Sequence, residues 1–240
     1  MPSHIPRGFL GCLLLLSLAL GLTTCATPGT SSLNYQEPKQ ETFKNETIVN
    51  KQFSDTWDVL VKELAKSFFV INNVEKASRI INVSFSTEKP EGYVDCGHSE
   101  RRFEYGDEST TFKYAIAESN HYKVADSWGP YNNLPAVFYL ARKASLDGRV
   151  NIYVAPKDNV TIVTANVRYI FTVRTSGQAH QMNAFGAVLQ MVAIPESSST
   201  VSFNTNQVGS ADWGTPQQAI LVKCRSTGLL ESQILGMASQ

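Results

Sequence analysis

The chain has 240 residues and a mass of 26.5 kDa, and its 21 basic residues balance its 21 acidic residues. A neutral chain lacks the basic face that a nucleic-acid-binding protein needs, so we expect no nucleic acid as a partner. A hydrophobic content of 42% and a charged content of 18% are typical of a globular protein. They argue against a coiled coil, a collagen and a wholly disordered chain.

The first 24 residues have the pattern of an export signal. Arg7 precedes an apolar run from Phe9 to Leu22, which is shorter than the roughly 20 apolar residues that a transmembrane helix needs. Small residues follow this run, as they do at the cleavage site of a secretory signal peptide. The sequence therefore predicts a signal peptide over residues 1–24.

The segment Leu22-Thr23-Thr24-Cys25 resembles the cleavage site of bacterial lipoprotein signals, in which small residues precede an acylated cysteine. The resemblance implies that Cys25 carries the lipid and attaches the protein to a membrane. It also implies the periplasmic face of the outer membrane, because Ala26 stands where an Asp commonly keeps lipoproteins in the inner membrane. The alternative is an ordinary cut near Ala26, which would release a soluble secreted protein.

Residues 25–44 are polar and contain Pro28, Gly29 and Pro38, so we expect a flexible tether between the lipidated cysteine and the folded part. Residues 45–240 are predicted to form a single periplasmic domain. Its first element is a helix over 54–67, where Trp57, Leu60 and Leu64 form one apolar stripe.

Strands and loops are predicted to alternate through the rest of the domain. The clearest strands are 150–154 and 160–174, which alternate apolar and polar residues and are joined by a turn at 156–159. Ile162 and Ile170 are exceptions on the polar side of this pattern. Segment 178–194 is ambiguous between helix and strand, and a final helix follows Ser226. Further strands are expected at 68–71, 79–86, 111–117, 121–126, 200–204 and 218–224, and loops at 88–109 and 205–217.

These elements predict an α+β fold, in which an antiparallel sheet carries an N-terminal and a C-terminal helix on one face. Helices near the two ends of the domain are consistent with both packing on the same face.

The cysteines define one possible crosslink. Cys12 leaves with the signal and Cys25 would be acylated, which leaves Cys96 and Cys224 in an exported chain where disulfides persist. The alternative is that both are buried free thiols. A metal site is not expected, because the chain has no CxxC or HExxH motif and few histidines. No cofactor is expected either.

Three features could carry chemistry or binding. Ser86 and Lys89 match the S-x-x-K pattern of serine nucleophiles, and Cys96 could act as a thiolate, which together make an envelope hydrolase an alternative. Trp128, Tyr131 and Trp213 stand among loop residues and could bind a small ligand or a cell-wall glycan by stacking. The charged residues between Asp95 and Glu108 could form a solvated loop or a binding loop.

The lipobox-like Cys25, the polar tether and the helix-strand-turn-strand unit from Trp57 to Phe85 are similar to BamC and other helix-grip outer-membrane lipoproteins. The likeness covers less than half of the chain, and only the lipid-acceptor role of Cys25 is carried over from it. It implies a non-enzymatic accessory or assembly protein of the envelope. Such a protein would be anchored to the lipid membrane through Cys25 and would act by contacting an envelope protein partner.

Overall fold

The structure is a computed structural model that describes residues 29–39, 41–126, 135–183, 185–214 and 219–240. Among these residues 63% lie in strands and 14% in helices. The elements in chain order are β1 (Thr30–Gln36), β2 (Glu46–Val49), α1 (Phe53–Lys66), β3 (Val70–Glu75), β4 (Ile80–Thr87), η1 (Pro90–Gly92), β5 (Val94–Asp95), β6 (His98–Tyr105), β7 (Glu108–Ala115), β8 (Asn120–Asp126), β9 (Ala136–Lys157), β10 (Val160–Met182), β11 (Val188–Asn204), β12 (Gly209–Trp213), β13 (Ile220–Ser226) and α2 (Leu229–Ala238).

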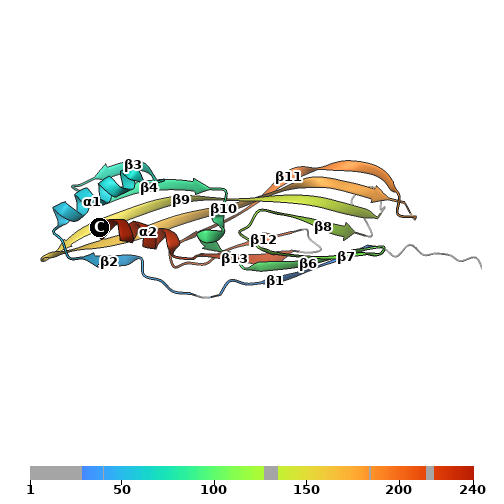
Figure 1. The fold of residues 1–240 in the computed structure, drawn as a ribbon, viewed down its shortest axis with the longest axis horizontal. Helices are drawn as coiled ribbons and strands as arrows, with labels where there is room; N and C mark the ends of the chain where they lie inside the picture. Colours follow the sequence, from blue (N-terminus) through green and yellow to red (C-terminus); the bar gives the residue numbers. More distant parts are fainter. Residues whose placement is uncertain (1–28, 40, 127–134, 184, 215–218) are drawn as a thin grey trace, which may run out of the picture.

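The strands form three antiparallel sheets in an elongated molecule (Figure 1). The largest sheet has seven strands in the order β11-β10-β9-β4-β3, with β2 pairing an end of β10 and β8 pairing an end of β9. The two smaller sheets have the orders β1-β6-β7 and β12-β13-β5. Because β9 and β10 run nearly the full length of the molecule, they determine its shape.

The expected α+β fold with an N-terminal helix is wrong. The described chain is predominantly β, and α1 follows β1 and β2 instead of opening the fold. The segment 88–109, predicted as a loop, instead contains η1, β5, β6 and the first two residues of β7, and the charged residues of β6 alternate with inward residues such as Phe103. Lys113 of β7 pairs with Glu100 of β6 at 3.1 Å, and Lys123 of β8 pairs with Glu108 of β7 at 2.6 Å. The many charged residues lead to the prediction of a loop. The structure shows strands instead, because the charged side chains lie on a face that is exposed to water.

The predicted tether is also wrong for part of its length. Residues 30–36 form β1, which pairs with β6 over its whole length, from Thr30 opposite Glu104 to Gln36 opposite His98. Leu33 and Tyr35 alternate with polar residues. This short period-2 pattern is sufficient for a strand to form once a partner strand supplies the backbone hydrogen bonds. The chain is consequently held against the folded body from Thr30 onward.

The long hairpin β9-β10 confirms the strand prediction and extends it. Its turn consists of Asp158 and Asn159, and Asp158 has a left-handed backbone (φ 50°) that Asp and Asn tolerate best among residues with a Cβ. Inward residues alternate with outward ones along both strands, which gives the sheet a buried face and an exposed face. The ambiguous segment 178–194 belongs to the strands β10 and β11 and the turn that connects them.

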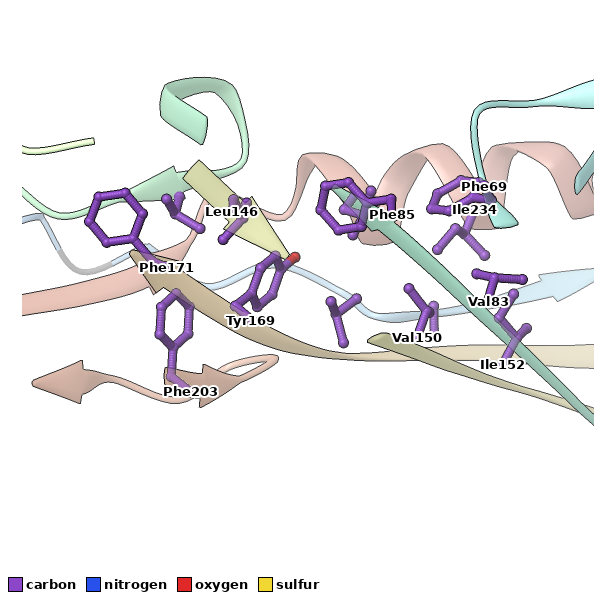
Figure 2. Packing of buried hydrophobic residues seen from close by; sticks show 14 of the residues in the cluster. Phe69, Val83, Phe85, Leu146, Val150, Ile152, Tyr169, Phe171, Phe203 and Ile234 are labelled. Atoms are coloured by element: carbon purple, nitrogen blue, oxygen red, sulfur yellow. The ribbon is translucent and has the colours of Figure 1, made fainter. Parts of the chain in front are cut away.

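The main core lies between the inner face of the large sheet and the two helices. Figure 2 shows the part of this core that lies between α2 and the sheet. Trp57, Leu60 and Leu64 of α1 are buried, as their spacing predicts, and the buried residues of α2 include Ile234. Gly148 leaves the space in which the Phe85 ring crosses β9, since a Cβ there would lie 1.8 Å from that ring. No helix in the described ranges is both long enough and apolar enough to cross a bilayer.

Candidate functional site

The residues predicted to bind or react are scattered in the chain. Cys25, Trp128 and Tyr131 lie outside the described residues. Trp213 ends β12, is partly buried and stacks on Phe171 with ring centroids 5.9 Å apart. Trp213 therefore packs against the core. The glycan-binding hypothesis needs all three aromatic residues in one cavity, and it stays a prediction.

The disulfide between Cys96 and Cys224 is confirmed, with sulfur atoms 2.04 Å apart. Both cysteines are almost fully buried, and they join the segment before β6 to β13. The alternative of two free thiols is wrong for this structure. A sulfur in a disulfide is not a thiolate, so Cys96 offers no nucleophile in this state.

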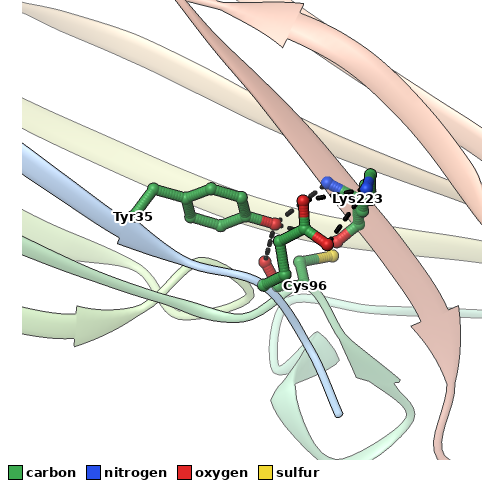
Figure 3. A network of polar contacts seen from close by, with 4 residues as sticks. Tyr35, Cys96 and Lys223 are labelled. Carbon is green, nitrogen blue, oxygen red and sulfur yellow. Dashed lines mark hydrogen bonds and ion pairs between the residues drawn. The ribbon is translucent and has the colours of Figure 1, made fainter. Parts of the chain in front are cut away.

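Tyr35 connects β1 to the backbone on both sides of this disulfide (Figure 3). The Tyr35 hydroxyl lies 3.1 Å from the carbonyl oxygen of Cys96 and accepts a hydrogen bond of 3.0 Å from the backbone N–H of Lys223. Lys223 Nζ forms an ion pair of 2.8 Å with Glu37, just beyond β1. These contacts hold the first strand against the crosslinked part of the core.

Ser86 has no activating partner in the described part of the chain. It lies near the end of β4 with an exposed side chain, opposite Asp147 of β9. No histidine or lysine among the described residues forms a hydrogen bond with its hydroxyl. The S-x-x-K chemistry needs the lysine one helical turn after the serine, whereas Lys89 follows a strand.

A buried carboxylate is the nearest approach to a catalytic arrangement. Glu231, in the first turn of α2, is fully buried and accepts hydrogen bonds from Tyr169 Oη at 2.7 Å and Thr205 Oγ1 at 2.8 Å. Ser226 Oγ lies 3.1 Å from the same carboxylate and accepts the backbone N–H of Gly228 at 2.9 Å. Burial, followed by the Glu231 charge, raises the pKa of Tyr169 well above its ordinary value, so this phenol stays protonated.

The arrangement of this network is better explained by stabilisation of the start of α2 than by catalysis. Its hydroxyl groups and the positive end of the α2 dipole together offset the free-energy cost of burying the Glu231 carboxylate away from water. A surface cavity of about 260 Å³ lies beside it, lined by Glu41, Thr42, Phe43, Asn206, Gln207, Val208, Arg225 and Ser226. Because Glu231 is fully buried, it cannot reach a substrate in that cavity. The described residues contain no cluster of three or more metal-ligating side chains.

A second buried cluster joins β7 and β8 to β9. Arg142 is almost fully buried, donates to the carbonyl of Ile116 at 2.8 Å and lies over the ring of Tyr114. Tyr114 stacks on Tyr122, and Arg101 covers the other ring at 4.6 Å. Burial lowers the pKa of Arg142 and raises that of Tyr122. Cation–π contacts offset part of the cost of burying the arginine charge. The cluster therefore has a structural role, which is to pack β7 and β8 against β9.

The exposed face of the large sheet carries an apolar area near the β9-β10 turn. Strand register places Ile48, Ile162 and Ala155 in one row, and Ile80 and Tyr153 in a neighbouring row on the same face. Ile48 is 60% exposed, Tyr153 44% and Ile80 37%. We call these five residues the outer-face patch. It lies on the face of the sheet opposite the buried core.

Two arginines lie further along the same face. Arg149 and Arg168 are directly opposite each other on β9 and β10, and both are exposed. Like charges in this position repel each other, and neither arginine forms an ion pair with another described residue. A protein surface with carboxylates next to an apolar centre would relieve this repulsion and cover the patch.

Sequence reasoning missed the outer-face patch, although one signal pointed to it. Ile162 was an exception on the polar side of the β10 pattern. Its significance appears only when β2 and β4 bring Ile48 and Ile80 onto the same face, from segments that are far apart in the chain.

Comparison with known proteins gives no match, whether with family models, curated proteins or solved structures. The likeness to BamC and other helix-grip lipoproteins accordingly stays an expectation from the sequence.

Proposed function

We propose that the protein is a non-enzymatic lipoprotein of the bacterial envelope, anchored through acylated Cys25 to the periplasmic face of the outer membrane. In this proposal it works as an accessory or assembly protein by contacting an envelope protein partner. The outer-face patch is the observation that carries the partner contact.

The patch has the composition of an interaction surface. An aromatic residue, Tyr153, stands among three isoleucines on a rigid sheet, and Arg149 lies four residues from Tyr153 along β9, opposite Arg168 of β10. Aromatic residues and arginines are enriched at protein interfaces, and a preformed sheet face binds with little ordering cost. The partner that fits has an apolar centre flanked by acidic side chains.

The shape of the molecule supports a role as an elongated spacer. The part of β10 between Ile162 and Met182 is about 65 Å long at about 3.3 Å per residue. The buried Cys96–Cys224 disulfide supports export, because such bonds persist in oxidising compartments such as the periplasm.

Site-specific photo-crosslinking in the producing cell tests the partner contact. A photoreactive phenylalanine analogue replaces Tyr153 in the patch or, as a control, Lys143, which is exposed on the same face of the same strand. We expect a single crosslinked species from position 153 and none of that size from position 143.

Two further substitutions in the patch complete the test. Ile48→Asp and Ile80→Asp should each remove the crosslink from position 153, because both place a charge in the apolar centre of the contact. Equal crosslinking from positions 153 and 143, or crosslinking that persists in both Asp variants, would contradict the proposed surface.

A further inference from the structure

The turn between β10 and β11 is the most apolar exposed part of the described chain. Phe185 is 90% exposed, Met191 65%, Leu189 58% and Val188 49%. We call these four residues the tip. From Thr175 to Pro195 the sequence contains no Asp, Glu, Lys or Arg, although the molecule elsewhere carries charges on most of its strands.

The tip is held in a defined shape. The side-chain oxygen of Asn183 accepts the backbone N–H groups of Phe185 and Ala187, each at 2.9 Å. The backbone N–H of Gly186 donates to the carbonyl of Asn183 at 3.0 Å, and Gly186 has the positive φ of 79° that favours glycine. A tight turn thus presents the Phe185 ring to solvent at the far end of the hairpin.

The tip lies at the same end of the molecule as the start of β1 (Figure 1). Tyr105 marks this proximity, since the Cβ position of Gly186 lies 3.9 Å from its hydroxyl and that of Gly29 lies 2.6 Å from its ring. Four peptide units connect Cys25 to Gly29, and any chain of that length spans at most about 14 Å. A lipid on Cys25 would therefore bring the tip to the membrane surface.

We propose that the tip inserts into the lipid bilayer that holds the acyl chains of Cys25, so that the protein has a second, non-covalent membrane contact. This inference rests on the proposed lipid anchor. Uncharged apolar side chains on a rigid turn can enter the boundary between headgroups and acyl chains without carrying a charge into it. The contact would fix the long axis of the sheet and place the outer-face patch at the end away from the membrane.

Vesicle co-sedimentation tests the tip separately from the lipid. The protein used is the mature chain from residue 25 with Cys25→Ser, which keeps every described residue and cannot be acylated. The vesicles contain phosphatidylethanolamine and phosphatidylglycerol. We expect measurable binding, and a loss of about tenfold or more in the Phe185→Ser, Leu189→Ser, Met191→Ser variant.

Matched substitutions at the opposite end provide the control. Val70 and Val74, both on β3, are 61% and 39% exposed, and Val70→Ser with Val74→Ser should leave vesicle binding unchanged. A Phe185→Trp variant adds a direct readout, because the fluorescence of the introduced indole should be quenched by brominated acyl chains.

The inference is overturned if the Cys25→Ser chain does not bind vesicles, if the tip and control variants bind equally, or if the added fluorescence of the Phe185→Trp variant is not quenched. Tip-dependent dimers in sedimentation velocity, without vesicle binding, would assign the tip to a second copy instead. Vesicle binding by the tip together with an unmodified natural N-terminus would retain the tip contact and reject the lipid anchor.

Discussion

The Cys96–Cys224 disulfide should contribute strongly to stability, because it closes a loop of 128 residues. The chain-entropy relation for a loop of this length gives about 5 kcal/mol at 25 °C through the restriction of the unfolded state. We therefore expect reduction of the bond to lower the free energy of unfolding by up to about 5 kcal/mol. The folded structure itself should persist, because the buried core of the large sheet remains.

Urea unfolding of the mature chain, followed by circular dichroism, measures this effect in the oxidised and the reduced protein. The reduced wild type retains both buried sulfur atoms, so it separates the crosslink from packing. The free energy of unfolding of the Cys96→Ala, Cys224→Ala variant should equal that of the reduced wild type, apart from the cost of the two small cavities that the missing sulfur atoms leave. Reduction should also increase the m-value, since an uncrosslinked chain exposes more surface when it unfolds. Identical unfolding midpoints with and without reductant would refute this reasoning.

The other predictions concern the buried hydroxyl and carboxylate groups. Tyr35→Phe should destabilise the protein by about 1–2 kcal/mol and should speed hydrogen exchange over residues 30–36, because the hydroxyl holds β1 beside the disulfide. Unchanged exchange there would contradict this role. Glu231→Ala should cost about 2–4 kcal/mol in urea unfolding, since it leaves the hydroxyls of Tyr169 and Thr205 without their acceptor. A loss of unfolding free energy no greater than that of an exposed Glu→Ala change would show that the network does not stabilise the fold. Tyr169 and Tyr122 ionise near pH 10 when unfolded, and burial raises both pKa values in the folded protein. Their contribution to stability is therefore complete below about pH 10 and is lost as the pH rises above it. Unfolding free energies at pH 8 and pH 11 should show this loss, and Tyr169→Phe should reduce it.

Local patterns were sufficient to predict several parts of the fold. The stripe of Trp57, Leu60 and Leu64 predicts α1, and the alternation along β9 and β10 predicts their hairpin. The expectation of export, together with the cysteine count, left Cys96 and Cys224 as the candidate disulfide, which the structure contains. In each case the decisive information lies within one segment or in the composition.

The rest depends on pairing between distant segments. The polar residues of β1 form a strand because β6 is available, and the charges of β6 and β7 are tolerated because they stay in water and pair with neighbouring strands. The outer-face patch depends on the relative register of β2, β4, β9 and β10, which no single stretch of sequence contains. Long-range strand pairing is the information that periodicity cannot supply.

The central claim is that acylated Cys25 anchors the protein to a membrane. Mass spectrometry of the natural N-terminus tests this claim most directly. The mature protein purified from its own envelope should begin at Cys25 and carry the mass of a diacylglyceryl group on the thiol. A mature chain that begins at or after Ala26 with an unmodified N-terminus, or a chain that keeps residues 1–24, would contradict it.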